Sequence, residues 1–202
     1  MIGFYDYTVV LTYGGLLFSV FGILSSMKGD FVGALLYVGL ALVCDTLDGK
    51  VAKTKKNRTR AQSMFGIQID SLCDMVSFGV TPVIFCYCAG MNSYADLALI
   101  CYYCLCCVIR LAYFNVLAAD KDPDEKSVYH GLPVVGFAIA LPVLYMLSLW
   151  FSANTVVWAL RVGMLLVGML YILDFHMPKP KLIMLLPLLV MYLAAFVMLC
   201  VY

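Results

Sequence analysis

Long apolar runs, each sufficient to cross a membrane as a helix, constrain the fold of this chain more than any other feature of its sequence. A helix needs about 20 predominantly apolar residues to span the hydrocarbon core of a bilayer. Seven stretches approach or exceed that length, and short polar connections separate them. They cover residues 5–26, 31–51, 66–90, 97–118, 131–151, 155–174 and 182–202.

The overall composition supports a membrane protein and leaves no room for a soluble domain. Hydrophobic residues make up 64 % of the 202 positions and charged residues 12 %, far from the averages of soluble domains. We therefore predict an all-α fold, a polytopic transmembrane helical bundle of about six to eight membrane helices. Residues 1–202 are expected to form a single transmembrane domain, and the first run is expected to be retained because no signal-peptide cleavage site follows it.

Basic residues concentrate in the connections after the second, fourth and sixth apolar runs. If every run spans once, these connections share one side of the membrane, and the positive-inside rule makes that side cytoplasmic. The first of these connections has a simple role in setting topology and contacting lipid headgroups, although its charges could also steer an anionic nucleotide. The basic residues are Lys53, Lys55, Lys56, Arg58 and Arg60, then Lys121 and Lys126, then Lys179 and Lys181.

Four aspartates interrupt the apolar pattern of the second and third runs. Asp45 and Asp48 are three residues apart and Asp70 and Asp74 are four apart, so each pair lies on one face of its helix. A lone ionised Asp in a membrane helix costs roughly 2.5–3.5 kcal/mol on insertion scales. If the two faces meet, the carboxylates converge into a site for a hard divalent cation, which would neutralise most of the charge.

Small residues accompany the aspartates and leave room either for close helix approach or for a ligand lying against backbone. The combined pattern resembles the signature of the CDP-alcohol phosphotransferase family of integral membrane enzymes. It reads Asp45-x-x-Asp48-Gly49-x-x-Ala52-Lys53 and, after a spacer, Gly66-x-x-x-Asp70-x-x-x-Asp74.

Two positions depart from the family pattern. The family usually has Arg where this chain has Lys53, and Lys keeps the charge but lacks the bidentate fork of a guanidinium. The spacer, twelve residues from Thr54 to Phe65, is also longer than usual.

Three further stretches resemble the serine-accepting branch of the family, the integral membrane phosphatidylserine synthases. The resemblance covers most of the chain from Asp45 to Pro133. That branch usually has Arg at the position of Tyr113, which is a departure. The stretches are Asp70-Ser71-Leu72-x-Asp74-x-Val76-Ser77-Phe78-Gly79-x-x-Pro82, Arg110-Leu111-Ala112-x-Phe114-Asn115-Val116 and Gly131-Leu132-Pro133.

The resemblance implies transfer of a phosphatidyl group from CDP-diacylglycerol to the hydroxyl of L-serine, with CMP leaving. It also implies a homodimer in the plasma membrane, an active site facing the cytoplasm, membrane lipids as neighbours and no nucleic-acid partner. An anionic pyrophosphate needs charge neutralisation before a hydroxyl can attack it, and a two-metal carboxylate cluster holding Mg²⁺ or Mn²⁺ supplies that.

The family also implies roles for individual residues. Asp45, Asp48 and Asp70 would hold the first metal, and Asp74 would join the second and act as general base on the acceptor hydroxyl. The CDP moiety would be lined by Thr12, Asp48, Gly49, Ala52, Lys53 and Gly66, and the acceptor or lipid phosphate would meet Arg110, Lys56, Arg58 and Arg60.

Several of these residues also have simpler interpretations. Thr12 could bond its own helix backbone, as hydroxyls in membrane helices commonly do, and Arg110 could extend to lipid headgroups. Pro82 is expected to kink the third helix and free a carbonyl. Arg161 is left out of the site because it could pair with Asp174 or face a subunit interface.

Two other functions remain compatible with the aspartates. A related transferase that uses glycerol phosphate or inositol phosphate would share the whole cluster, and a phosphorylated acceptor would need extra basic residues nearby. A cation transporter could use four carboxylates as a transport site. Transporters often contain an internal repeat, and no second Asp-rich pair matches the first here.

Overall fold

A computed structural model of the protein describes residues 3–4, 7–55, 57, 59–119, 129–177 and 182–201. Helices account for nearly all of the regular structure, and two short strands form the remainder. The helical elements are η1 (Tyr7–Val9), α1 (Val10–Met27), α2 (Phe31–Thr54), α3 (Arg60–Asp74), η2 (Met75–Val80), α4 (Thr81–Cys88), α5 (Tyr94–Ala119), α6 (Gly136–Met146), η3 (Leu147–Leu149), α7 (Ala153–Ile172) and α8 (Leu182–Val201), and the strands are β1 (Tyr129–His130) and β2 (His176–Met177).

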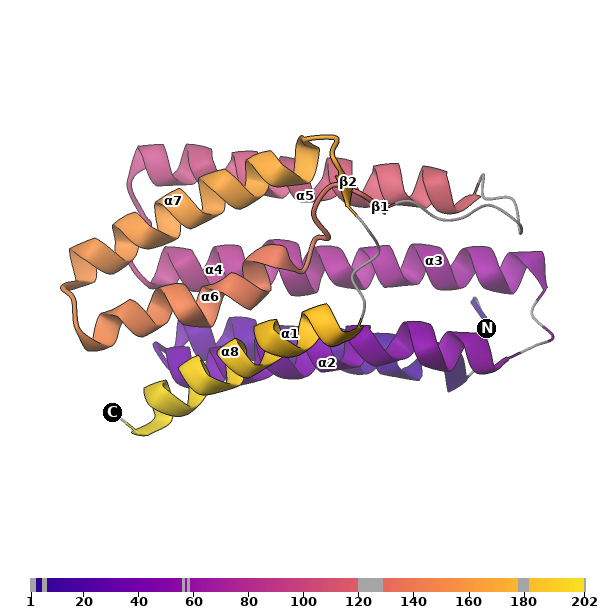
Figure 1. The fold of residues 1–202 in the computed structure, drawn as a ribbon, viewed down its shortest axis with the longest axis horizontal. Helices are drawn as coiled ribbons and strands as arrows, with labels where there is room; N and C mark the ends of the chain where they lie inside the picture. Colours follow the sequence, from indigo (N-terminus) through magenta and orange to yellow (C-terminus); the bar gives the residue numbers. More distant parts are fainter. Residues whose placement is uncertain are drawn as a thin grey trace.

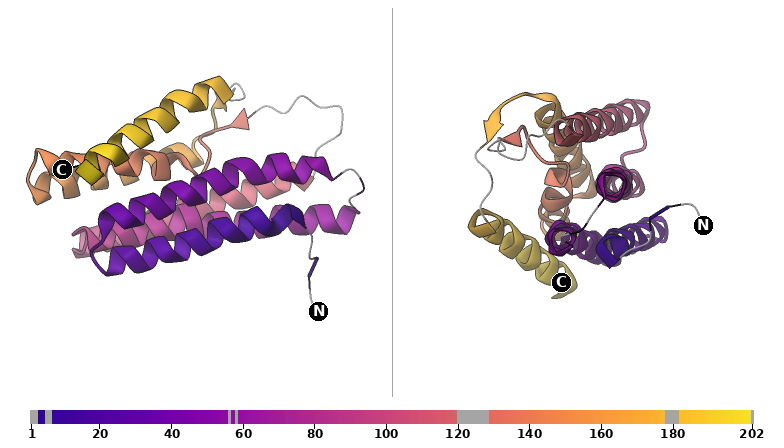
Figure 2. Two further views of the ribbon diagram at one scale, coloured as in Figure 1. Left: turned by 90° about the horizontal axis from the view of Figure 1, so that it is seen from below. Right: turned by 90° about the vertical axis from the view of Figure 1, so that its right-hand side faces the viewer.

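The helices lie side by side along the long axis of the molecule (Figure 1). Helices α1 and α2 form an antiparallel hairpin, α3 continues through η2 into α4, and α5 runs back beside it (Figures 1 and 2). Helices α6, α7 and α8 lie against these on the other side of the bundle (Figure 2). The prediction of an all-α helical bundle is confirmed, and each apolar run coincides with one helical segment.

Length and composition identify the helices that can cross a membrane. Among the described residues, five helical segments are long and apolar enough, while Gly136–Leu149 and Tyr192–Val201 are apolar but shorter. Five such helices in one chain indicate an integral membrane protein. The five segments are Tyr7–Met27, Phe31–Ala52, Arg60–Cys88, Tyr94–Ala118 and Ala153–Ile172.

Polar residues fix where α2 and α3 begin. Thr59 and Gln62 form a capping box at the start of α3, in which each side chain accepts a hydrogen bond from the backbone N–H of the other residue. At the start of α2 the Asp30 carboxylate accepts the Gly33 N–H at 2.9 Å. Gly29, which precedes this cap, has φ +78°, a conformation that favours glycine and reverses the chain between α1 and α2.

The buried core lies where α4, α5, α6 and α7 meet α2. Tyr103 of α5 packs against Phe137 of α6 with ring centroids 5.2 Å apart and against Tyr171 of α7 at 5.8 Å. Phe85 of α4 meets Phe31 of α2 edge-on at 5.2 Å. Aromatic contacts of this kind stabilise helix packing beyond their buried area alone.

The helix that carries Asp74 departs from α-helical geometry directly after that residue. Residues Met75–Val80 form a π-helical turn, and Pro82 follows in the first turn of α4. Pro82 has no N–H for the carbonyl four residues earlier, and that carbonyl, of Phe78, instead accepts the Tyr103 hydroxyl at 2.9 Å. The carbonyl for which Pro82 provides no N–H is therefore that of Phe78, a π-helical turn precedes Pro82, and the expected kink stays a prediction.

Arg161 pairs with a residue that the sequence did not suggest. Its Nε and one terminal nitrogen donate to the two carboxylate oxygens of Asp96 at 2.6 and 2.9 Å. The alternative of an Asp174 partner is therefore wrong. Asp96 is the nearer group because α5 and α7 pack together and bring the start of α5 beside the first half of α7.

Candidate active site

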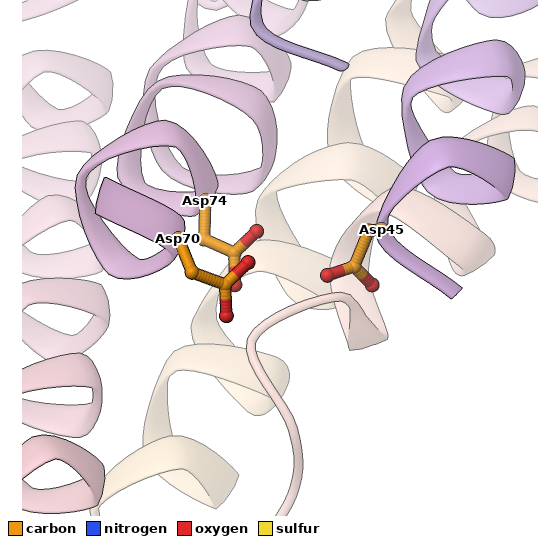
Figure 3. A group of neighbouring side chains, drawn as sticks. All are labelled: Asp45, Asp70 and Asp74. Atoms are coloured by element: carbon orange, nitrogen blue, oxygen red, sulfur yellow. The ribbon is translucent and has the colours of Figure 1, made fainter. Parts of the chain in front are cut away.

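Three of the four aspartates come together between α2 and α3. One carboxylate oxygen from each of Asp45, Asp70 and Asp74 lies within 4.8 Å of the other two. Figure 3 shows Asp70 and Asp74 leaving one helix and Asp45 leaving the other, with their carboxyl groups turned toward the space between. The three- and four-residue spacings put each pair on one helical face, and the packing of these helices brings the faces together.

Asp48 lies in the same acidic group and has a fixed partner on a third helix. It is 7 % exposed, and its Oδ2 accepts the Thr12 hydroxyl of α1 at 2.8 Å. The Asp48 carboxyl group also comes within hydrogen-bonding range of Asp70, and that of Asp45 within range of Asp74. The site is therefore built from α1, α2 and α3, with carboxyl groups paired across the α2–α3 interface.

A small pocket adjoins the carboxylates between the helices, with Gly15, Ala41 and Phe78 in its wall. Asp45, Asp48 and Asp74 line it together with Thr12 and Ser77. Its volume is about 10 Å³, which is close to the minimum for a single water molecule. The pocket suits one water or one small ion and is far too small for a nucleotide, which would have to lie at the open end of the helices.

The donor set fits a hard divalent cation. Two ionised carboxylates cannot donate hydrogen bonds to each other, so the facing pairs need either a shared proton or a cation between them. Asp70 Oδ1 is buried and has no hydrogen-bond partner among the described residues. A buried acceptor without a donor is costly, and carboxylate oxygens are the ligands that Mg²⁺, Mn²⁺ and Ca²⁺ prefer.

Comparison with known proteins places this acidic site in a family. The CDP-alcohol phosphatidyltransferase family model matches residues 8–169, which include all four aspartates and most of the helices. The chain belongs to this family. The matched region includes α2 and α3, between which the carboxylates meet.

Individual relatives carry names that concern serine. A "CDP-diacylglycerol--serine O-phosphatidyltransferase" of Methanocaldococcus jannaschii is 33 % identical over 160 residues, 78 % of this chain and 68 % of the relative. Proteins with that name from Saccharomyces cerevisiae and Mycobacterium bovis are 34 % and 33 % identical over 54 % and 63 % of this chain. The chain's matches span 40 % and 45 % of the lengths of these two.

The small residues of the phosphatidyltransferase signature lie along the two helices toward the end where α2 finishes and α3 begins. A Cβ added to Gly49 would meet nothing within 4 Å, so Gly49 is not needed for close helix packing and leaves open space for a ligand. Ala52 and Gly66 are half-buried, and Arg60 is exposed at the first position of α3. Lys56, Arg58 and the side chain of Lys53 lie outside the described residues, and their predicted phosphate contacts stay predictions.

Arg110 is buried rather than extended toward lipid. It is 4 % exposed, its Nε donates to the Leu132 carbonyl at 2.9 Å, and its guanidinium lies 4.0 Å from the centroid of the Phe114 ring. The interpretation as a headgroup-reaching side chain does not fit this burial. Contact with an acceptor or lipid phosphate stays a prediction for Arg110.

Two hydroxyl residues beside the aspartates were not anticipated as site residues from the sequence. Ser77 lines the pocket beside Asp74, and its Oγ accepts the Ser19 hydroxyl of α1 at 2.7 Å. Ser77 lies three residues after Asp74, the spacing that places side chains on one helical face. That spacing is the sequence feature that could have pointed to Ser77, whereas Ser19 is brought in only by the packing of α1.

Proposed function

We propose that this protein transfers the phosphatidyl group of CDP-diacylglycerol to the hydroxyl of L-serine, producing phosphatidylserine and CMP. The observation that carries the proposal is the convergence of Asp45, Asp48, Asp70 and Asp74 within the matched phosphatidyltransferase region. The names of the relatives support serine as the acceptor. We further propose that residues 1–202 act as one transmembrane domain, as a homodimer in the plasma membrane, with the site open to the cytoplasm.

In this proposal, Asp45, Asp48, Asp70 and Asp74 would hold the divalent cations, Mg²⁺ or Mn²⁺. Bound cations supply neutralisation of the pyrophosphate charge and stabilise the departing phosphate oxygen. The exposed backbone at Gly49, with Ala52 and Gly66 nearby, would face the CDP moiety at the open end of α2 and α3.

Asp74 is the proposed general base for the acceptor. The serine hydroxyl oxygen forms a new bond to the phosphorus that carries the diacylglycerol, and the bond from that phosphorus to the CMP oxygen breaks. The Asp74 carboxylate takes the hydroxyl proton, and CMP leaves with the negative charge. Asp74 belongs to this step because it lies at the junction of α3 and the π-helical turn, beside the pocket and Asp45.

Purified protein in detergent micelles, supplied with CDP-diacylglycerol and Mn²⁺ or Mg²⁺, tests the proposal through the rate of CMP release. We expect release that requires L-serine, stops when a chelator removes the metal, and falls at least 10³-fold in Asp74→Asn. The control is Asp30→Asn, because Asp30 caps the opposite end of α2 and Asn is an equally good cap.

Other outcomes point to the alternatives. CMP release that requires glycerol 3-phosphate or inositol phosphate instead of serine would keep the transferase and overturn the acceptor. Metal binding without CMP release for any acceptor would overturn the transferase and favour cation transport.

A further inference from the structure

Asn115 of α5 connects two residues on one turn of α3. Its Oδ1 accepts the Ser71 hydroxyl at 2.7 Å, and its Nδ2 donates to Gln68 Oε1 at 3.4 Å. Gln68 and Ser71 are three residues apart, so they lie on the same face of α3 and one amide group can reach both. The side chain of Asn115 thus spans a single helical turn from the neighbouring helix.

The turn that Asn115 spans carries Asp70. Successive residues of an α-helix are rotated by about 100°, so Ser71 faces α5 while Asp70 faces α2 and the other carboxylates. Asp70 Oδ1 is buried without a hydrogen-bond partner among the described residues. The direction of that oxygen therefore depends on how α3 itself is oriented.

Helix α5 holds the same helix a second time beyond Asp74. The Tyr103 hydroxyl donates to the Phe78 carbonyl at 2.9 Å within the π-helical turn. The two contacts, at Ser71 and at Phe78, lie before and after Asp74 in the chain. The segment that carries Asp70 and Asp74 is thus attached to α5 at both ends, on the side away from α2.

From these contacts we propose that Asn115 is a positioning residue for the metal site: its amide sets the rotation of α3 so that the carboxylates of Asp70 and Asp74 face Asp45. The inference rests on the proposed divalent-metal function of these aspartates. Asn115 lies outside the group of aspartates, and in this proposal it acts through Ser71 and Gln68. Residues that orient metal ligands from behind typically change metal affinity by 10- to 100-fold when they are replaced.

Binding of Mn²⁺ to the purified protein, followed by the electron paramagnetic resonance signal of free Mn²⁺, gives a readout that does not depend on turnover. We expect Asn115→Leu to raise the Mn²⁺ dissociation constant about 10-fold. Ser71→Ala, which removes only one hydroxyl, should raise it by a smaller factor. Adding Ser71→Ala to Asn115→Leu should change it no further, because the two side chains act through one hydrogen bond.

Two control variants separate positioning from a general loss of structure. Ser26→Ala removes a buried hydroxyl bonded to the Gly22 carbonyl at the opposite end of α1, and Asn154→Leu changes an exposed residue in the first turn of α7. Neither should alter Mn²⁺ binding. In the CMP assay, Asn115→Leu should raise the Mn²⁺ concentration that gives half-maximal rate and largely keep the rate at saturating Mn²⁺.

Three other outcomes would contradict the positioning role of Asn115. If the unaltered protein, Asn115→Leu and Ser71→Ala all bind Mn²⁺ with equal affinity, Asn115 does not position the metal site. The proposed function would remain intact. A loss of rate at saturating Mn²⁺ without a change in Mn²⁺ affinity would also overturn the role of Asn115. Absence of Mn²⁺ binding by the unaltered protein would overturn the metal site and this inference together.

Discussion

Thr12 of α1 donates its hydroxyl hydrogen to Oδ2 of Asp48 of α2 at 2.8 Å, and both side chains are buried. The two residues are 36 positions apart in the chain. The hydroxyl is thus bonded to an acidic residue of the site rather than to its own helix backbone, which was the simpler expectation for Thr12. This bond fixes the orientation of the Asp48 carboxylate from the side of α1.

Replacing Thr12 by Val should therefore weaken the metal site while keeping the shape of the side chain. Asp48 would lose the donor that orients it, and we expect Mn²⁺ affinity to fall about 10-fold. Thr12→Ser keeps the hydroxyl and should bind nearly as well as the unaltered protein. Mn²⁺ titration of the three proteins checks this, and equal affinity in Thr12→Val would show that Asp48 is oriented by something other than Thr12.

The Asp96–Arg161 pair should stabilise the bundle without affecting chemistry. Asp96 is 1 % exposed and also accepts hydrogen bonds from the backbone N–H and hydroxyl of Ser93 at 3.0 and 2.6 Å. The Arg161 side chain is 25 % exposed. Arg161→Met would leave the buried carboxylate without its cation and should lower the free energy of unfolding by about 1–3 kcal/mol.

Unfolding in micelles with a rising fraction of sodium dodecyl sulfate measures this change. Because Asn can still accept from Ser93 and carries no charge, Asp96→Asn combined with Arg161→Met should recover most of the lost free energy of unfolding. The rate of CMP release per folded molecule should stay unchanged in both variants. A double variant as unstable as Arg161→Met alone would contradict the idea that an unpaired Asp96 is the cause.

Gly131 occupies a position that only glycine fits. Its φ is +66°, and an added Cβ would lie 2.9 Å from the Leu173 carbonyl oxygen and 3.5 Å from the Arg110 guanidinium. Gly131→Ala should lower the free energy of unfolding by about 1–2 kcal/mol from backbone strain alone, with the clash adding to it. Gly49→Ala is the matched control, because its Cβ would meet nothing within 4 Å, and inside helix α2 it should not lower the free energy of unfolding but raise it by up to about 1 kcal/mol.

The helices and the convergence of the aspartates were predictable because both depend on local periodicity. Runs of about 20 apolar residues specify membrane helices regardless of their partners. The spacings of Asp45 with Asp48 and of Asp70 with Asp74 place each pair on one face. The cost of charge inside a membrane helix then favours a packing in which those faces meet.

The contacts that depend on the relative register of distant helices were not predictable in the same way. Nothing in the spacing of Arg161 distinguishes Asp96 from Asp174, since the choice depends on how α5 and α7 pack. The partner of Thr12 depends likewise on the axial position of α1 relative to α2. Asn115 belongs to the stretch from Arg110 to Val116 that resembles the serine-accepting branch of the family. Its contact with Ser71 nevertheless depends on how α3 and α5 pack together.

The π-helical turn after Asp74 provides a last prediction about how the site is supported. The residue four positions after Phe78 is Pro82, which has no N–H to donate to the Phe78 carbonyl. That carbonyl accepts a hydrogen bond from the hydroxyl of Tyr103, which lies in the fully buried core. Tyr103→Phe should remove this hydrogen bond from the buried core and lower the free energy of unfolding by about 1 kcal/mol.

Adding Pro82→Ala should recover part of that loss, because alanine brings back an N–H four residues after Phe78. Tyr87→Phe, at an exposed tyrosine of α4, serves as the control and should have little effect. Unfolding in mixed micelles compares the unaltered protein with Tyr103→Phe, Pro82→Ala, the double variant and Tyr87→Phe. If Pro82→Ala lowers the free energy of unfolding as much in Tyr103→Phe as in the unaltered protein, the effects of Pro82 and Tyr103 are independent. The Phe78 carbonyl would then not couple them.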